Sequence, residues 1–307
     1  MSCNIHAVIV TFKPNILILK KCIVSLIDQV NKIYIIDNTP FDCIELKLYS
    51  YEKEKIEIIY LHENKGIAYA QNIGIKKAID NGADYILTSD QDTIYPENYI
   101  NDMILIFKKY NKQKVAAVAP FFRDVNSNNQ LMPIMIYNKN KIIRKRMFNE
   151  IPEEIYSVSH VISSGMIIKK DALLCIGLMD VVLFIDWVDT EWCFRANTLG
   201  YNIIQTSNVI ITHQHGDYAK KIFNYTLTKH NYIRRYYRIR NGVFLLLNNK
   251  YLNKSMKKYI IEELIKMVIM HFFQANNIIN EIYNKYYAFK DGINKNLGKL
   301  RRNLKES

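Results

Sequence analysis

The chain has few cysteines, and they form no recognisable pairs. Its five cysteines are scattered without a C-x-x-C pair, which argues against a disulfide framework or a zinc site. No apolar run approaches the roughly 18 residues of a transmembrane helix, and no signal peptide is recognisable. No G-x-G-x-x-G follows the first predicted strand and no G-x-x-x-x-G-K-[ST] occurs, so NAD-type and Walker-type sites are not expected. We therefore expect reduced thiols and a cytoplasmic protein.

Acidic residues are missing from one long stretch. Residues 218–261 contain no Asp or Glu but eleven Lys or Arg. The whole chain carries a net charge of +13, which favours polyanionic partners such as nucleic acid, an anionic membrane or a diphosphate substrate. With 307 residues, 49% of them hydrophobic and 23% charged, the chain is predicted to be globular with a large core.

Strands and helices are predicted to alternate between residues 5 and 119. Runs rich in β-branched residues at 5–12, 32–39, 56–61, 85–88 and 115–119 favour buried strands. Apolar residues at helical spacing in 19–30 and 67–78 favour helices. Short links between them indicate βαβ units with right-handed crossovers. The predicted fold is α/β, with a Rossmann-like, mostly parallel sheet and helices on both faces.

Polar side chains gather at the carboxyl ends of these strands, namely Thr11, Asp37, Asn38, Asp90 and Asp92. Ligands of parallel α/β sheets bind at this edge. Asp90 and Asp92 would face the same way on an extended chain. Mg²⁺ and Mn²⁺ prefer such oxygen ligands, and Mg²⁺ usually shares its shell with substrate phosphates. The pattern predicts a diphosphate–metal site, with a polar Asx-type turn as the alternative.

The middle of the chain is less regular. Asn, Lys and Arg dominate residues 121–155, which predicts an irregular segment, either a binding loop or a solvated one. The sequence Ser163-Ser164-Gly165 then interrupts an apolar run. Such a break either allows a ligand to approach closely or marks a β-bulge.

An aromatic, apolar stretch at 183–196 holds Asp186, Asp189 and Glu191. A carboxylate in a partly dry setting has a raised pKa, which suits a general base. Alternatively, Asp189 caps a helix that Gly200 ends, and Glu191 complements the helix dipole. The two interpretations are compatible, because a base at a helix start is well oriented.

The basic region offers three further features. His213 follows a predicted strand at 201–212 and would be a metal ligand, a phosphate-binding group or a structural residue. Arginine and tyrosine interleave at 234–241, which suits phosphate, nucleic acid or an anionic membrane. Apolar residues at helical spacing in 256–273 predict a helix that packs on the domain, lies on a membrane or pairs with another subunit. The basic tail 294–307 is expected to fray.

Taken together, these motifs resemble glycosyltransferase family 2, and in particular its rhamnosyltransferase-like branch of bacterial polysaccharide synthesis. The resemblance covers about residues 5–245 and rests on 7–12, 35–38, 63–74, 89–92, 164–165, 184–193, 213–217 and 236–241. It implies a GT-A fold, with a transferase domain at 1–245 and a helical, basic extension at 246–307. It also implies inverting, single-displacement transfer from a nucleotide-diphosphate sugar.

The resemblance also implies roles for individual residues. Asp189 would be the catalytic base, and Asp90, Asp92 and His213 would hold a divalent Mg or Mn ion. Residues bordering the donor nucleotide would be Thr11, Asp37, Asn38, Asn64, Gly66, Asn72 and Asp90. Residues on the side of the acceptor or the leaving diphosphate would be Glu191, Trp192, Arg238 and Arg240. Many family members carry an acid where this chain has Val188, so Asp186 and Glu191 stay open as alternative bases.

The expected enzyme is therefore a glycosyltransferase that moves a sugar to a lipid-linked oligosaccharide in O-antigen or capsule synthesis. The expected donor is dTDP-rhamnose, and a UDP-sugar is the alternative. The expected location is cytoplasmic, peripheral on the inner face of the plasma membrane and in contact with anionic lipid. The positive charge leaves a nucleic-acid-binding protein as a rival of another class, although no nucleic-acid partner is expected. A degenerate sugar-binding subunit is a third possibility, against which the intact Asp90, Asp92 and Asp189 argue.

Overall fold

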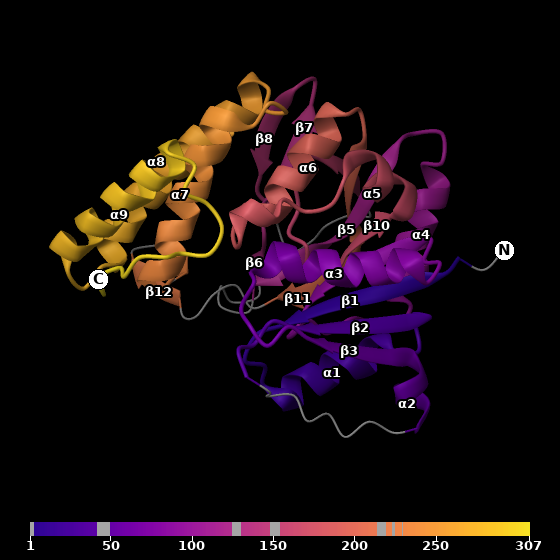
Figure 1. Cartoon of the computed structure of the whole chain (residues 1–307). Helices are drawn as coiled ribbons and strands as arrows, with labels where there is room; N and C mark the ends of the chain where they lie inside the picture. The colour runs from indigo at the N-terminus through magenta and orange to yellow at the C-terminus, as the bar shows by residue number, and fades with distance from the viewer. Residues whose placement is uncertain are drawn as a thin grey trace.

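One large sheet with helices on both faces runs through the molecule, and three C-terminal helices lie together beside it (Figure 1). The computed structural model describes residues 3–41, 50–124, 130–147, 154–213, 219–222, 225–228 and 230–307. The predicted α/β class is confirmed, with a parallel part of the sheet contributed by the first half of the chain and a mixed part by the second.

The first half of the chain alternates strands and helices as predicted. Its elements are β1 (Ile5–Thr11), α1 (Ile16–Leu26), β2 (Lys32–Asp37), α2 (Ser50–Lys55), β3 (Ile56–Tyr60), α3 (Ile67–Asp80), β4 (Tyr85–Asp90) and α4 (Tyr99–Lys109). All seven residues of β1 are buried, because helices cover both faces of the sheet at its centre.

The second half adds more strands and the C-terminal helices. Its strands are β5 (Val115–Asp124), β6 (Gln130–Leu131), β7 (Ile134–Asn138), β8 (Lys141–Lys145), β9 (Ile155–Val158), β10 (Met166–Lys169), β11 (Asn202–His213), β12 (Ala219–Ile222) and β13 (Tyr225–Thr228). Its helices are α5 (Lys170–Ile176), the 3-10 turn η2 (Val181–Leu183), α6 (Val188–Thr198), α7 (Tyr232–Asn248), α8 (Lys254–Gln274) and α9 (Ile278–Ile293).

The strand order places the candidate site. The sheet runs β3-β2-β1-β4-β10-β5-β11-β9-β7-β8, and β3, β2, β1 and β4 are parallel. Their carboxyl ends meet at one edge, where Thr11 pairs with Asp37 and Val10 with Asp90. Strand β10 is antiparallel to β4, with Met166 opposite Thr88, so it begins at the edge where β4 ends. The residues just before β10 are thereby carried to the same edge.

Two expectations about irregular segments are wrong. Residues 121–155 include β7 and β8, a hairpin at the outer side of the sheet. The Lys and Arg side chains of β8, the outermost strand, suit an edge position, where charge faces solvent and discourages further pairing.

The second correction concerns residues 294–307, hereafter the C-terminal strap, which do not fray. The Gly298 N–H donates to the carbonyl of Val182 at 2.8 Å, and the guanidinium of Arg235 donates to the carbonyl of buried Ser307 at 2.9 Å. These contacts fasten the strap along α7.

The packing of the three C-terminal helices bears on the expected domain boundary. Helix α7 packs against both α8 and α9, and the domain boundary expected after residue 245 falls within it. That boundary stays a prediction. Among the described residues, no helix combines the length and apolar character that crossing a bilayer requires.

Candidate active site

A buried carboxylate lies where β1 and β2 end. The Thr11 hydroxyl donates to Asp37 Oδ1 at 2.9 Å, and Thr39 donates to the same oxygen from its hydroxyl at 2.7 Å and its N–H at 3.2 Å. The other oxygen, Asp37 Oδ2, is buried and has no hydrogen-bond partner among the described residues. A buried acceptor without a donor costs free energy, so this oxygen is poised to accept a hydrogen bond from a ligand.

The loop at 63–66 is built on Asn38, the residue after β2. The Asn38 amide donates to Asn64 Oδ1 at 3.1 Å and accepts from the Lys65 N–H at 2.8 Å. Asn64 Oδ1 also accepts from the Gly66 N–H at 3.0 Å. Gly66 has φ +88° and ψ 158°, a region that is essentially restricted to glycine. A Cβ there would lie 2.6 Å from the carbonyl oxygen of Phe184, so both conformation and space require glycine.

Asp90 and Asp92 lie at the end of β4, beside the loop that precedes β10. The Asp90 N–H donates to Ser164 Oγ at 3.3 Å, and the amide of Gln91 accepts from the Phe12 N–H at 2.8 Å. Asp92 Oδ1 is buried without a hydrogen-bond partner in the part of the chain that the structure describes. The backbone of this segment is therefore fixed, while one carboxylate oxygen is left for another ligand.

These carboxylates fit a divalent metal that shares its shell with a substrate. Their donors are hard oxygens, which Mg²⁺ and Mn²⁺ prefer, and the unpartnered Asp92 Oδ1 is the atom such an ion would satisfy. Within the described residues, no group of three or more His, Cys, Asp or Glu side chains converges, so phosphate and water oxygens would complete the shell. Thr212 bridges Ile94, which brings the backbone of His213 close to Asp92; the side chain of His213 lies outside the described part.

Asp189 occupies the first turn of α6 and faces the same region. Its Oδ2 accepts from the Ser163 N–H at 3.2 Å and its Oδ1 from the Thr190 N–H at 2.8 Å. Burial raises the pKa of Asp189 from 3.8 to about 6, the two N–H donors oppose this rise, and the charges of Asp186 and Asp90 add to it. A carboxylate with this pKa is ionised at neutral pH and remains a useful proton acceptor.

A strained turn carries the chain into α6. Phe184, Asp186 and Trp187 all have positive φ, at 66°, 62° and 65°, which is costly for residues other than glycine. The buried amide of Asn241 on α7 holds this turn by donating to the carbonyls of Leu183 at 2.7 Å, Ile185 at 2.8 Å and Asp186 at 3.2 Å. Helix α7 thus fixes the position at which α6, and with it Asp189, begins.

Asp186 differs from Asp189 in its surroundings. Arg234 forms an ion pair with Asp186 at 3.2 Å. Burial opposes ionisation of Asp186, but the charges of Arg234 and Arg238 outweigh it and hold its pKa below the usual range. A carboxylate that keeps its charge so firmly is a poor base, so the electrostatics favour Asp189 over Asp186 for that role.

Two of the expected ligand-side residues use their polar atoms within the protein. The Asn72 amide donates to the Met179 carbonyl at 2.9 Å and accepts from the Met179 N–H at 3.0 Å. The Trp192 indole is buried in the core and donates to the Gly177 carbonyl at 2.8 Å. These contacts connect α3 and α6 to the segment around α5, so both side chains stabilise the framework around the site.

Glu191 also uses its polar atoms for hydrogen bonds within the protein. Both of its oxygens accept from the guanidinium of Arg195, at 3.1 and 2.8 Å, and Asn249 donates to one of them at 3.1 Å. Its side chain is 3% exposed. A buried, bidentate ion pair of this kind leaves little capacity to accept a proton from an acceptor sugar, which places Glu191 in a structural position.

The two arginines expected at the diphosphate have different surroundings. Arg240 is 1% exposed and donates to Asn241 and to the carbonyls of Leu183 and Gly298. The guanidinium of Arg238 makes no hydrogen bond or close ion pair with another described residue; burial lowers its pKa, and nearby Asp186 opposes that effect. Arg238 is thus the arginine with free donors near Asp186, and Arg240 ties the turn to the C-terminal strap.

Sequence reasoning missed the residues that join the parts of the site. The Thr88 hydroxyl donates to the Ser163 carbonyl at 2.6 Å, and Ser163 and Ser164 donate to Asp189 and accept from Asp90, respectively. The loop at 163–165 therefore connects the aspartate pair to the candidate base. The small-residue break in the sequence was a signal for this loop, whereas the motif at 236–241 included Asn241 without indicating that it holds the turn before α6.

A sheet of this strand order between two layers of helices, with a carboxylate pair at the end of β4 and the half-buried carboxylate of Asp189 nearby, is the arrangement of a glycosyltransferase of the GT-A class. A family model described as Glycosyl transferase family 2 matches residues 7–177, and the chain belongs to this family. It is 35% identical over 249 residues to the dTDP-rhamnosyl transferase RfbF of Shigella flexneri, covering 81% of this chain and 82% of the relative.

Solved structures share the fold. TarS of S. aureus superposes with a TM-score of 0.61 at 14% identity, over 95% of this chain and 49% of that chain. GalNAc-T7, solved with UDP, GalNAc and Mn²⁺, superposes with a TM-score of 0.58 at 14% identity, over 88% of this chain and 58% of that chain. The chain thus spans about half the length of these two structures, and at such identities the likeness concerns the fold alone.

Proposed function

We propose that this glycosyltransferase transfers rhamnose from dTDP-rhamnose with inversion at the anomeric carbon. The dTDP-rhamnosyl relative supports the donor. The observation that carries the mechanism is the loop at 163–165, which holds Asp90 through Ser164 and Asp189 through Ser163. One short segment thereby sets a diphosphate–metal site against a carboxylate whose pKa is about 6.

The reaction is a single displacement. The acceptor hydroxyl oxygen attacks the anomeric carbon of the donor sugar while Asp189 takes the hydroxyl proton. The bond between that carbon and the β-phosphate oxygen breaks, and the nucleoside diphosphate leaves with the bonding electrons. Arg238, whose donors are free, offers positive charge to the leaving group. A divalent Mg or Mn ion held by Asp90 and Asp92, with His213 as a further ligand, would neutralise charge on the diphosphate.

The donor nucleotide lies, in this proposal, across the carboxyl ends of β1 and β2. Asp37 Oδ2 would accept a hydrogen bond from it, since that buried oxygen has no donor among the described residues. Thr11 orients Asp37, and Asn38 and Asn64 shape the adjoining loop. Gly66 lets this loop approach Phe184, which keeps the donor side and the base side in contact.

The acceptor is proposed to be a lipid-linked oligosaccharide of O-antigen or capsule synthesis. Such an acceptor places the enzyme at the inner face of the plasma membrane, in peripheral contact with anionic lipid. The stretch 218–261 has eleven Lys or Arg and no acidic residue. Some of these arginines are buried, but Lys250, Lys254 and Lys257 are exposed and support this placement, because basic surfaces are attracted to anionic leaflets.

A thermal-shift series tests the donor and the metal together. The full chain is melted with dTDP, UDP, GDP or a short single-stranded DNA, each with and without Mn²⁺. A ligand that binds only the folded state raises the melting temperature. We expect a metal-dependent rise with dTDP that is lost in Asp92→Ala and kept in Asp80→Ala, an exposed aspartate of α3 that serves as the matched control.

The other outcomes are equally informative. A rise with UDP in place of dTDP would keep the mechanism and replace rhamnose with the sugar of a UDP donor, the nucleotide present in the GalNAc-T7 structure. A rise with DNA alone, indifferent to Mn²⁺ and to Asp92→Ala, would overturn the proposal in favour of a nucleic-acid-binding protein.

A further inference from the structure

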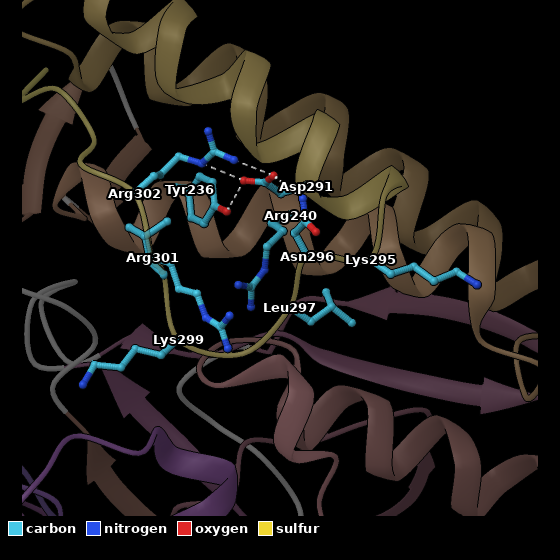
Figure 2. A pocket seen from close by; sticks show the side chains of 10 residues that line it. Tyr236, Arg240, Asp291, Lys295, Asn296, Leu297, Lys299, Arg301 and Arg302 are labelled. Atoms are coloured by element: carbon cyan, nitrogen blue, oxygen red, sulfur yellow. Dashed lines mark hydrogen bonds and ion pairs between the residues drawn. The ribbon is translucent and has the colours of Figure 1, made fainter.

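A cavity of about 520 Å³ lies between α7, α9 and the C-terminal strap (Figure 2). It is lined by Tyr236, Arg240, Asp291, Lys295, Asn296, Leu297, Lys299, Leu300, Arg301 and Arg302. Five of these ten side chains are cationic and only one is acidic. The cavity includes Arg240, which the sequence analysis placed near the leaving diphosphate, and Lys299, which pairs with Glu63 at 2.9 Å beside the donor loop. It contains none of the residues assigned to the nucleotide, the metal or the base, so it adjoins the candidate active site without overlapping those residues.

The described protein balances only part of the positive charge of the cavity. Lys299 pairs with Glu63 at 2.9 Å and Arg302 pairs with Asp291. Asp291 accepts from Arg302 at 2.8 and 3.0 Å and from the hydroxyl of Tyr236 at 2.7 Å, so its charge is already shared. Arg301 and Lys295 have no hydrogen-bond or ion-pair partner among the described residues. Arg240, at 1% exposure, contacts carbonyls and an amide but no described carboxylate.

The directions of these side chains add to the imbalance. The guanidinium groups of Arg301 and Arg240 project into the same space, whereas Lys295 and Lys299 extend toward its two sides (Figure 2). Like charges that face one another repel. An anion between them removes that repulsion, and the planar fork of arginine matches the geometry of a phosphate.

Helix α9 ends beside this cavity. Unlike a typical surface helix, it buries polar side chains and exposes apolar ones. Its buried face carries polar residues, among them Glu281, Asn284 and Asp291. Its exposed face carries large apolar side chains at spacings of three and four residues, hereafter the α9 stripe: Ile278, Ile279, Ile282, Tyr286, Phe289 and Ile293. An apolar helix face turned outward marks a surface that meets another apolar phase.

We propose that the basic cavity binds the phosphate of a membrane lipid while the α9 stripe enters the apolar side of the membrane interface. The stripe ends at Ile293, two residues before Lys295 of the cavity, so one short segment meets both parts of a lipid. Four of the six side chains of the stripe are isoleucines, which suit hydrocarbon and offer no surface for base stacking, and this composition favours lipid over nucleic acid. This inference rests on the proposed membrane-bound acceptor.

Vesicle sedimentation with the full chain tests the inference. The vesicles are phosphatidylcholine alone, phosphatidylcholine with phosphatidylglycerol, and phosphatidylcholine with a few per cent of a polyprenyl diphosphate. The test variant is Lys295→Gln with Arg301→Gln, both exposed and without described partners. The matched control is Lys108→Gln with Lys109→Gln, two exposed lysines of α4 that remove the same charge. A second test variant, Ile279→Ser with Ile282→Ser, addresses the α9 stripe.

We expect wild type and the Lys108/Lys109 control to bind anionic vesicles within about threefold of each other. The Lys295/Arg301 variant should bind about 30-fold more weakly, the loss expected for two basic contacts with an anionic surface. The stripe variant should bind at least about tenfold more weakly. Binding only to the polyprenyl diphosphate would identify a lipid diphosphate as the ligand, and equal binding to phosphatidylglycerol would identify any anionic headgroup; both support the site.

Equal losses in the Lys295/Arg301 variant and the control would overturn the inference, as would binding of single-stranded DNA in place of vesicles. The dTDP-induced rise in melting temperature separates this inference from the proposed function. If the rise in melting temperature persists in all variants and the Lys295/Arg301 variant binds vesicles as well as wild type, the lipid site is refuted. The transferase mechanism is then unaffected. If the rise is absent from wild type, the proposed donor fails whatever the vesicles show.

Discussion

Replacing Asp189 with asparagine should remove catalysis and change how stability depends on pH. The substitution keeps the shape of the side chain but removes the base, so transfer should fall at least about 100-fold. In wild type, kcat/KM should rise with pH around a pKa of about 6, so that the rate at pH 5 is about a tenth of the plateau. Donor-nucleotide binding should stay nearly intact, because the described hydrogen bonds of the Asp189 carboxylate run to Ser163 and Thr190 and not to the residues assigned to the nucleotide.

The same pKa fixes the size of the stability effect. Burial raises the pKa of Asp189 from 3.8 to about 6, which corresponds to about 3 kcal/mol of unfolding free energy. Below the unfolded-state pKa, the carboxyl is protonated in both states and costs nothing. As pH rises through the folded-state pKa, ionisation favours the unfolded chain, and this part of the wild-type stability is lost. Asparagine does not ionise. Any hydrogen bond to Ser163 or Thr190 that Asp189→Asn loses therefore changes the unfolding free energy by the same amount at every pH.

Urea unfolding in EDTA, from pH 4 to pH 7.5, measures the difference between Asp189→Asn and wild type. That difference should move by about 2 kcal/mol in favour of the variant as pH rises. The exposed Asp80→Asn control should show a flat difference. A flat difference for Asp189→Asn as well, with no inflection of the rate profile near pH 6, would refute the assignment of Asp189 as a buried base.

Three further substitutions test the framework around the site. Asn241→Ala leaves three carbonyls of the strained turn without their donor, so urea unfolding should show a loss of about 3 kcal/mol; an unchanged stability would mean that the turn holds itself. Gly66→Ala places a Cβ 2.6 Å from the Phe184 carbonyl and should lower stability by at least about 2 kcal/mol and weaken dTDP binding in titration calorimetry. Arg238→Gln should lower kcat/KM about 30-fold with stability within about 1 kcal/mol, and a large loss of stability in that variant would point to a structural arginine.

The parallel half of the fold could be predicted because each of its strands is covered on both faces. The β-branched run that forms β1 has one physical interpretation once short links to helices follow it. The positions of Asp37 and Asp90 follow directly, since parallel strands end at the same edge. The edge strand β8 could not be predicted in this way, because it carries Lys and Arg, which a solvated loop carries too.

In the second half of the chain, the role of each polar side chain depends on tertiary packing, which the local sequence pattern does not encode. Arg238 and Arg240 lie two residues apart on α7, so they point to different sides of the helix, and only the positions of neighbouring elements decide which is free. Glu191 and Asp189 likewise share one helix, yet Arg195 neutralises the first and burial raises the pKa of the second. The order of the C-terminal strap depends on the buried pair of Arg235 and Glu281 at 2.8 Å, which joins residues far apart in the sequence.

The insertion of β10 between β4 and β5 has a consequence for how the enzyme is made on the ribosome. Asp90 is synthesised more than 70 residues before Ser164, which accepts a hydrogen bond from the Asp90 N–H and contacts the hydroxyl of Thr93. Until β10 has emerged, the edge of β4 has no partner on that side, and such an open edge favours misassociation. The candidate active site at the end of β4 is therefore completed late in synthesis. A chain break anywhere between β5 and β10 should leave two fragments that become active only when they reassociate.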